Sequence, residues 1–494
     1  MGQLAWKILL ATVLIAGLAV RAFVAPFTTG SDIAQFAGFA DTFLKRGECF
    51  FHYAGRESSS LEKWPYPWPY PYGVLPILLL GAIRLIAPQP VKSYWKGSTY
   101  YVYAPPEWII AVKAMLVFFD LVTALLIYRL VSKYSIKRGV AAATFYFLNP
   151  AVIYTSSIYG MLDPIPSALL LVAIVLYESG GSDRVRVYLS ALLAGLAVTS
   201  KPNALYPGVF FLLYVLLKNR GEPIHSLGAV LLGFACGTIA PFAVFEAMCP
   251  GSIQTFVNVL TDVSTPRYNP PIVYSFNGFT SLATYLHDKT GGDYMWMITY
   301  WVIPGSLLLA LLAFWTICKI EVDRLYEILY LSYLIYVTTY WRINYQYFLV
   351  LVALSSIYVF AMAGRPTLKL LVVLHLALVS SWTVMFPVSW WARVHIENPN
   401  IELVKVLDRI SLMVFSQEVY LFYEIVLTMS GYVVLACHFS SMNFTRCTSG
   451  GLRGLRHRVR RLIPLSTFRR SPRGTQPIYP PRGNSNPVLW DSTA

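Results

Sequence analysis

Apolar residues along this chain form long continuous segments separated by short polar turns. Many segments are long enough to cross about 30 Å of hydrocarbon as a helix. Apolar and polar residues do not alternate within them, which excludes the strands of a membrane β-barrel. Because backbone groups in lipid must be satisfied internally, the pattern predicts an all-α, polytopic transmembrane protein with about twelve spans. The predicted spans are 4–25, 108–131, 139–157, 164–178, 187–200, 203–218, 226–246, 295–317, 325–341, 343–363, 368–388 and 416–438.

One further apolar segment, residues 73–87, contains Pro76 and Arg84. Counting it as a full span would move the basic turns that follow it outside the membrane, so we expect a re-entrant or interfacial helix. It then lies in a long first outer loop, 26–107. The predicted organisation is a transmembrane domain with this loop and two further outer loops, followed by a tail; the ranges are 1–440, 247–294, 389–415 and 441–494.

Basic residues gather in the turns that this threading places in the cytoplasm. With the N-terminus inside, each inner turn has at least two cations, as the positive-inside rule requires. The C-terminal tail continues the pattern, with ten arginines and no acidic residue from Arg446 to Arg482. The inner turns and their edges carry Lys133, Lys137, Arg138, Arg184, Arg186, Lys218, Arg220, Lys319, Arg324, Arg365 and Lys369.

The composition agrees with a membrane protein, since 56% of residues are hydrophobic and only 13% are charged, against about 25% in soluble domains. The net charge of +15 admits nucleic acid as a partner. A basic tail after a last span is more typical of an anchor on anionic lipid, so we expect membrane lipid and no nucleic acid. No eukaryotic retention signal is visible, which favours a prokaryotic plasma membrane with both termini in the cytoplasm. The end of the tail, rich in Pro, Gly and Ser, is expected to be disordered.

Two carboxylates lie at predicted outer turns. Asp32 follows the first span and opens the amphipathic stretch Ser31–Arg46, which predicts a helix along the membrane surface. Asp163 lies between two spans, directly before Pro164. Each could be a helix cap, but ionisable groups near bilayer depth are costly, and both are therefore also functional candidates.

Cations and aromatic residues share the same predicted face. Lys201 and Arg342 lie in outer turns, and each could be an interfacial anchor or a ligand for an anion. The stretch 64–72 alternates Pro with Trp or Tyr, which suits either a stiff interfacial loop or stacking on sugars. Trp390 and Trp391 are expected at the interface.

Short motifs in a characteristic order resemble glycosyltransferases of the GT-C type that use polyprenyl-phosphate sugars. The resemblance is nearest to the catalytic subunit of glycosylphosphatidylinositol mannosyltransferase I and to prokaryotic mannosyltransferases. That pattern has a second acidic residue two positions after the first, where this chain has Ala34. Several relatives have a Trp-Gly-Gln lead before the second-site Asp, where this chain has Tyr159-Gly160-Met161-Leu162. The matching stretches are Ser31-Asp32-Ile33, Tyr70-Pro71, Leu148-Asn149-Pro150, Gly160 to Asp163, Lys201 to Pro207 and Gln346-Tyr347-Phe348.

The resemblance implies transfer of a hexose, expected to be mannose, from a polyprenyl- or dolichyl-phosphate sugar to a lipid- or protein-linked glycan at the outer face, with inversion. Asp32 is expected to be the base, and Asp163 to orient hydroxyl groups. Arg342, Lys201 and Arg267 are expected to hold the phosphate. No metal and no cofactor are expected. The other predicted substrate-binding residues are Gln346, Tyr70 and Asn277.

Two alternatives stay open. A secondary transporter or lipid-sugar flippase would also carry broken helices and buried charges, although the chain has no internal repeat of the kind that many transporters have. A scaffold that has lost activity would explain the missing second acidic residue.

The six cysteines form no Cys-x-x-Cys pair, so the sequence indicates no zinc or redox motif. Cys49 and Cys249 both fall in predicted outer loops, where a disulfide could form.

Overall fold

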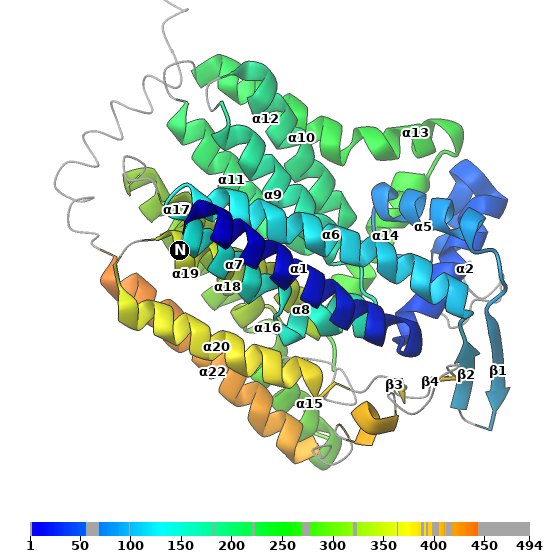
Figure 1. The fold of residues 1–494 in the computed structure, drawn as a ribbon. Helices are drawn as coiled ribbons and strands as arrows, with labels where there is room; N and C mark the ends of the chain where they lie inside the picture. The colour runs from blue at the N-terminus through cyan, green and yellow to red at the C-terminus, as the bar shows by residue number, and fades with distance from the viewer. Residues whose placement is uncertain are drawn as a thin grey trace, which may run out of the picture.

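The computed structural model describes residues 2–55, 69–97, 99–180, 183–219, 223–268, 277–319, 324–362, 364–386, 390–391, 394–397, 405–409, 411 and 417–442. These residues form a bundle of packed helices with a small sheet at one end (Figure 1). The helices are α1 Gln3–Val24, α2 Ser31–Arg46, α3 Phe50–Ala54, α5 Val74–Ile86, α6 Pro106–Ser132, α7 Ile136–Phe147, α8 Pro150–Ile153, α9 Pro164–Glu178, α10 Arg184–Ser200, α11 Leu205–Lys218, α12 Pro223–Thr238, α13 Ala240–Met248, α14 Ser252–Ser264, α15 Gly278–Thr290, α16 Met295–Thr299, α17 Val302–Lys319, α18 Leu325–Thr339, α19 Phe348–Ala361, α20 Pro366–Val384 and α22 Gln417–Ser441. Short helical turns are η1 Ala25–Phe27, η2 Gly47–Cys49, η3 Tyr154–Tyr159, η4 Pro202–Ala204 and η6 Tyr345–Tyr347.

Proline fixes where several helices begin. It opens α6, α8, α9 and α20, where its missing N–H is not needed and its φ suits the first turn. The predicted span 139–157 is divided at Pro150, whose helix α8 is capped by the Asn149 side chain accepting from the Ala151 N–H at 2.9 Å. A proline and the side-chain cap before it therefore break the predicted span 139–157 into separate helices.

Five helices in the described residues are long and apolar enough to cross a membrane, or up to six if the bent pair Ile224–Thr238 and Ala240–Met248 is one span. A helix or broken helix occupies each predicted span, yet the count of about twelve spans is not confirmed. The reason is length, since several apolar helices have only 10–17 residues and a helix rises about 1.5 Å per residue. Among them is α5, the segment expected to be re-entrant or interfacial.

A four-stranded sheet departs from the all-α expectation. Its strands are β1 Lys92–Lys96, β2 Thr99–Tyr103, β3 Trp390–Trp391 and β4 Val394–Ile396, in the order β1-β2-β4-β3. β1 pairs antiparallel with β2, with Lys92 opposite Tyr103, and β2 runs parallel to β4, with Tyr100 opposite Val394. Aromatic and β-branched residues favour strands, but these runs are short and lie almost 300 residues apart, so the pairing was not visible in the sequence.

The centre of the bundle is α18, in which every residue is buried. It packs against α11, α17, α19 and α22. A helix that is apolar all round has no face suited to water and is stable only when surrounded by other elements. α18 therefore runs through the protein core from one end of the bundle to the other.

Two opposite charges inside predicted spans are paired with each other. Arg21 of α1 lies 3.7 Å from Asp120 of α6, and its guanidinium lies 4.0 Å from the ring centroid of Phe147. Tyr146 also donates to Asp120 at 2.9 Å. Because an unpaired charge in an apolar interior is costly, these contacts tie α1 to α6 and α7.

Cys49 and Cys249 form a disulfide, with Cα atoms 5.2 Å apart, as the sequence suggested. The bond joins the end of η2 to the end of α13. Near it, Glu246 accepts from the N–H groups of Gly251 and Ile253, both at 2.8 Å. The segment predicted as the first outer loop is thus fastened to the segment that follows α13.

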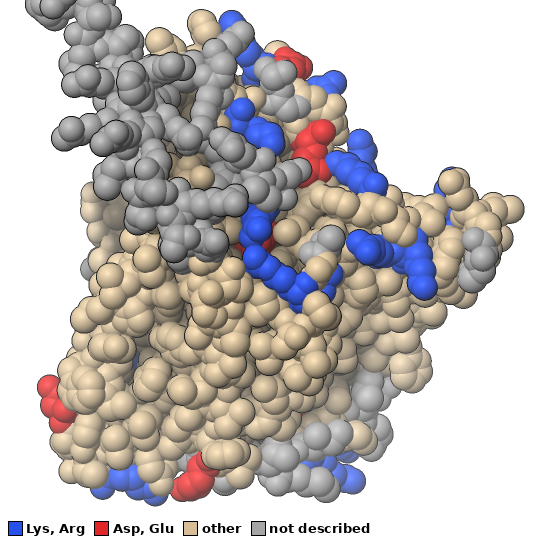
Figure 2. Space-filling model, turned by 90° about the vertical axis from the view of Figure 1, so that its left-hand side faces the viewer, with Lys and Arg blue, Asp and Glu red and all other residues tan. Residues whose placement is uncertain are grey.

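Charged side chains are unevenly distributed over the surface. Figure 2 shows the side of the molecule on which α1 begins, the left-hand side of Figure 1. Lys and Arg gather in the upper part of this face and outnumber Asp and Glu there, and a broad area below them carries other residues. This surface agrees with the basic inner turns of the sequence. The predicted disordered tail and the Pro/aromatic residues Trp64 to Trp68 lie outside the described residues.

Candidate active site

A buried ion pair joins two of the predicted site residues. Asp163 stands at the N-terminus of α9 and Lys201 at the C-terminus of α10, and since these helices are antiparallel neighbours, both residues lie at one end. The Lys201 ammonium donates to Asp163 Oδ2 at 2.5 Å, with side-chain exposures of 5% and 0%. Asp163 Oδ1 is buried and accepts no hydrogen bond from the described residues. Burial raises the pKa of Asp163, which Lys201 counteracts; burial likewise lowers the pKa of Lys201.

Asp32 lies in the first turn of α2 and faces the same ion pair. Burial raises the pKa of its carboxyl to about 6, while the positive charge of Lys201 acts in the opposite direction and the negative charge of Asp163 adds to the rise. At neutral pH the group is therefore mostly ionised but more basic than an ordinary aspartate. Asp32 and Asp163 thus form two carboxylates that share one lysine.

Two glycines explain how these carboxylates come together. Gly30 donates its N–H to the Tyr159 carbonyl at 2.9 Å, and a Cβ on Gly30 would lie 2.1 Å from Cδ1 of the Tyr159 ring. Gly160 has φ +87°, and a Cβ there would lie 2.2 Å from Cδ1 of Ile33. Each segment therefore approaches the other where it has no side chain, which brings the start of α2 against the turn before Asp163.

Two α6 residues hold the start of α2 in place. The Lys113 ammonium is buried and donates to the carbonyls of Ala25 at 3.1 Å and Ile158 at 2.8 Å, and also to Thr28. Trp108 donates its indole N–H to the Ile33 carbonyl at 2.7 Å. Sequence reasoning missed both residues, although a lysine within an otherwise apolar span was a visible signal.

Tyrosines surround the lysine. The Lys201 Nζ lies 4.8 Å from the ring centroid of Tyr347 and 5.9 Å from that of Tyr72. Tyr333 donates to the Tyr347 carbonyl and accepts from Asn203, each at 2.8 Å. The predicted Lys-Pro motif is therefore packed on aromatic faces that stabilise a cation.

Two arginines lie near this group. Arg342 follows α18 and interacts electrostatically with Tyr347 and with Arg267, and burial together with the charge of Arg267 lowers its pKa. Among the described residues no carboxylate forms an ion pair with Arg342. Arg267 lies 3.6 Å from Asp262 and is 41% exposed. Two neighbouring guanidinium groups, of which Arg342 has no carboxylate partner among the described residues, are suited to bind an anion.

The other predicted substrate-binding residues have different surroundings. Gln346 is buried in η6 beside Tyr347. The Tyr70 hydroxyl donates to the Gly73 carbonyl at 2.8 Å, and its ring packs on Phe39 and Phe50. Asn277 caps α15, with Oδ1 accepting from Phe279 and Thr280 N–H groups and Nδ2 donating to the carbonyls that end α18. Tyr72, two residues after Tyr70, is the tyrosine of that motif next to Lys201.

Within the described ranges, no three His, Cys, Asp or Glu side chains are grouped so that they could hold a metal ion. The charged and aromatic side chains that the structure gathers at the candidate site are two carboxylates, a lysine, two arginines and tyrosines.

The apolar helices define an integral membrane protein. Residues 98–339, just under half of the chain, match the model of glycosyltransferase family 87. The chain is a membrane glycosyltransferase, as the sequence predicted. The matched region includes Lys113, Asp163, Lys201 and Arg267, while Asp32 and Arg342 lie outside it.

Among solved structures, the chain is similar to ArnT from Cupriavidus metallidurans bound to undecaprenyl phosphate, at 10% identity and a TM-score of 0.45, covering 90% of this chain and 79% of that one. No curated protein matches the chain.

Proposed function

We propose that this glycosyltransferase has a GT-C-type architecture and moves a hexose, with mannose the first choice, from a polyprenyl-phosphate sugar to a lipid- or protein-linked glycan at the outer membrane face. The observation that carries the proposal is the Asp32, Asp163 and Lys201 group at the predicted outer ends of apolar helices, together with Arg342, which interacts with the same Tyr347 that packs against Lys201. A lipid-linked donor suits this place, because its tail can stay in the bilayer while its sugar phosphate reaches the site.

The reaction needs a base and a stabilised leaving group. The acceptor hydroxyl oxygen attacks the anomeric carbon, the bond from that carbon to the phosphate oxygen breaks, and the lipid phosphate leaves with the electron pair. The hydroxyl proton passes to Asp32, whose raised pKa of about 6 makes it a better proton acceptor than an ordinary aspartate. Attack opposite the leaving group inverts the anomeric configuration.

Asp163 and Lys201 are assigned to orientation. Asp163 Oδ2 is held by Lys201, which leaves the buried Oδ1 without a hydrogen-bond donor among the described residues. A sugar or acceptor hydroxyl would supply that donor. The lysine thus fixes the carboxylate in one position while its charge favours the ionised form of Asp32.

Arg342 and Arg267 are assigned to the phosphate. Charge grows on the phosphate oxygen as its bond to carbon breaks, and fixed guanidinium groups stabilise it without reorganising. Arg342 is largely withdrawn from water, which strengthens its interaction with an anion. Gln346, Tyr70 and Asn277 stay predictions for substrate contacts.

The test is sugar transfer from radiolabelled polyprenyl-phosphate mannose and polyprenyl-phosphate glucose in proteoliposomes with a glycolipid acceptor. We expect the wild-type protein to transfer label and Asp32→Asn to transfer roughly 10²-fold less or lower still. Glu48→Gln removes an exposed carboxylate that also lies in the first outer loop, and should match the wild type. Equal transfer by Asp32→Asn would move the base elsewhere. Movement of label across the bilayer without transfer would favour a flippase.

A further inference from the structure

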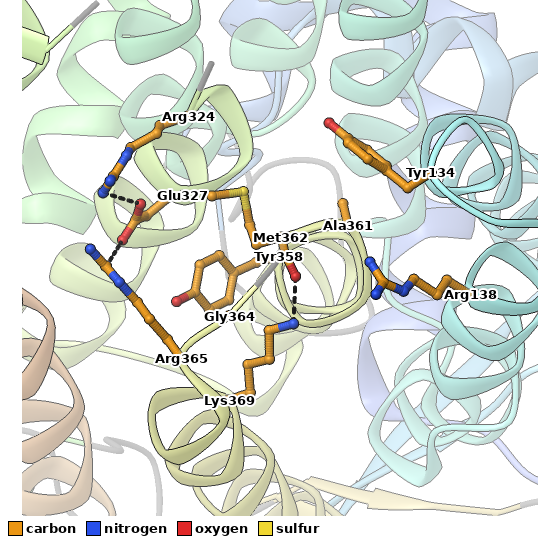
Figure 3. Close-up of a pocket in the computed structure, with 10 residues that line it drawn as sticks. All are labelled: Tyr134, Arg138, Arg324, Glu327, Tyr358, Ala361, Met362, Gly364, Arg365 and Lys369. Atoms are coloured by element: carbon orange, nitrogen blue, oxygen red, sulfur yellow. Dashed lines mark hydrogen bonds and ion pairs between the residues drawn. The ribbon is translucent and has the colours of Figure 1, made fainter. Parts of the chain in front are cut away.

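A second polar site lies at the opposite end of the bundle from the candidate active site. It is a cavity of about 280 Å³ between the C-terminal ends of α6 and α19 and the starts of α7, α18 and α20 (Figure 3). α18 begins here and ends near Arg342, so about 22 Å of helix separates the two sites. The charged residues that line it are Arg138, Arg324, Glu327, Arg365 and Lys369.

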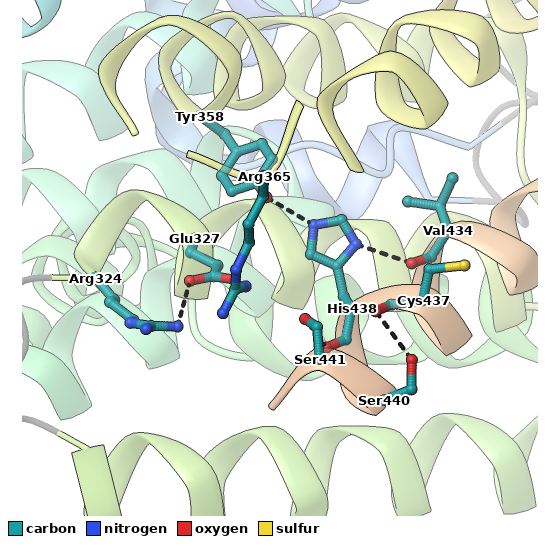
Figure 4. Close-up of polar contacts among 9 residues, drawn as sticks. All are labelled: Arg324, Glu327, Tyr358, Arg365, Val434, Cys437, His438, Ser440 and Ser441. Atoms are coloured by element: carbon teal, nitrogen blue, oxygen red, sulfur yellow. Dashed lines mark hydrogen bonds and ion pairs between the residues drawn. The ribbon is translucent and has the colours of Figure 1, made fainter. Parts of the chain in front are cut away.

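The cavity has an excess of positive charge. Four cations face one carboxylate, Glu327, which gives a formal charge of +3. Glu327 is 1% exposed and pairs with Arg324 at 3.1 Å and Arg365 at 2.7 Å, as Figure 3 and Figure 4 show. These two ion pairs fix both guanidinium groups on the wall of the cavity. Tyr358 lies beside them, and its hydroxyl shares a hydrogen bond of 2.9 Å with the His438 ring.

The other two cations are not compensated by a carboxylate. Arg138 and Lys369 repel each other electrostatically. Lys369 donates to the Met362 carbonyl at 2.5 Å, and within the described residues Arg138 forms no hydrogen bond or ion pair. In Figure 3 Arg138 lies at the right of the cavity and Lys369 below its centre, whereas Glu327 lies at the left. An anion placed between them would remove the repulsion.

Helix geometry adds to the positive field. Three helices begin at the cavity: α7 with Arg138 in its first turn, α18 with Arg324 directly before it, and α20 with Arg365 before it and Lys369 in its first turn. Helix N-termini carry unpaired N–H groups and partial positive charge, and favour anions rather than cations. Cations at these positions therefore oppose the helix dipoles unless an anion lies among them.

The backbone directly before α20 has an uncommon conformation at the cavity. Arg365 has φ +52°, and it is the one non-glycine residue with positive φ in the described part of the chain. L-residues rarely adopt this conformation, so it persists only where neighbouring contacts hold it. Here the contact is the ion pair with Glu327, which aims Arg365 along the cavity wall. The positive-inside rule accounts for basic residues in inner turns, but not for their convergence on a cavity.

We propose that this basic cavity binds a phosphate group, with Arg138 and Lys369 as its main ligands and the fixed Arg324 and Arg365 as its rear wall. Two sources have this chemistry: the headgroup of an anionic phospholipid in the inner leaflet, or free phosphate from the cytoplasm. The proposal does not depend on the glycosyl donor or on the outer site.

The test uses the full-length protein. Lipid binding is measured by native mass spectrometry in phosphatidylcholine nanodiscs with and without phosphatidic acid, and inorganic phosphate binding by the thermal midpoint in detergent. The variant is Arg138→Gln with Lys369→Gln. The matched control is Lys137→Gln, an exposed cation on the same first turn of α7 that does not line the cavity.

We expect saturable binding of at least one probe by the wild type and Lys137→Gln, and roughly tenfold weaker binding by the double variant, as expected for the loss of charge-assisted hydrogen bonds. Binding of phosphatidic acid alone would identify a lipid headgroup site, and binding of inorganic phosphate as well would identify a site for the free anion. Equal binding by the double variant, or no saturable binding of either probe by the wild type, would overturn the proposal.

Discussion

The ammonium of Lys201 and the carboxylate of Asp163 lie 2.5 Å apart in the protein interior, where both side chains are buried. A buried charge that loses its partner costs far more than the pair contributes to stability. Mutation can therefore separate the contribution of the pair to stability from its contribution to sugar transfer.

Lys201→Met should lower the free energy of unfolding by roughly 3 kcal/mol, because Asp163 is left buried without its counter-charge. Lys201→Met combined with Asp163→Leu removes both charges and should recover most of that stability. Sugar transfer should stay lost in the double variant if the pair orients substrate. The checks are thermal unfolding in nanodiscs and the transfer assay on the same preparations. Recovered transfer in the double variant would show a purely structural pair.

Asp32 should give opposite pH dependences for activity and stability. As a base it must be ionised, so transfer should fall as the pH drops through about 6, the raised pKa of its carboxyl. Its folded-state pKa lies above the ordinary value of 3.8, so its contribution to stability is complete below about 3.8 and is lost as the pH rises through about 6. We therefore expect Asp32→Asn to be inactive but more stable than the wild type at pH 8.

The measurement is a pair of pH series, one of initial transfer rates and one of thermal midpoints, with Glu48→Gln as the control. In Asp163→Asn the acid limb should move to lower pH, because the negative charge of Asp163 adds to the rise of the Asp32 pKa. A rate that does not depend on pH between 5 and 7 would contradict Asp32 as the base.

Gly30→Ala should displace the start of α2, which carries Asp32, from the turn before Asp163. The new Cβ would lie 2.1 Å from the Tyr159 ring, so α2 or the ring has to move. A displacement near 1 Å at reacting groups can cost roughly 10²-fold in rate, and we expect a loss of that order. Gly228→Ala is the control, since its Cβ meets no atom within 4 Å. Unchanged transfer by Gly30→Ala would mean that the approach of α2 to Tyr159 does not position Asp32.

The sequence predicted the ends of elements better than their interiors. The stretch Ser31–Arg46 became α2 with the same bounds, and Asp32, Asp163 and Lys201 came together as the outer-face assignment required. Apolar periodicity predicted α2, and the alternation of spans and turns predicted that the turns with Asp163 and Lys201 lie at one end of the bundle.

What the sequence did not predict depends on contacts between distant segments. Lys113 lies inside α6, where hydropathy averages over a single charge, and its role depends on carbonyls of Ala25 and Ile158 that only the fold brings near. The β2–β4 pairing likewise joins residues almost 300 positions apart. The positions of Arg342 and Arg267 relative to Lys201 also could not be derived from their spacing in the sequence. Assigning turns to one membrane face does not show which of these turns are neighbours in the fold.

The disulfide gives the last prediction. Cys49 and Cys249 close a loop with a sequence separation of 200 residues, and a bond of this kind restricts the unfolded chain, with a typical contribution of about 2–5 kcal/mol. Cys49→Ser with Cys249→Ser should lower the thermal midpoint, and a reductant should lower the wild-type midpoint to the same value without affecting the variant. Cys437→Ser, at a free cysteine in α22, is the matched control and should leave both measurements unchanged. Because the bond fastens the loop that contains α2 to the segment after α13, transfer should also become more sensitive to heat in the double variant. A wild-type midpoint that does not respond to reductant would show that the two thiols are not joined in the membrane.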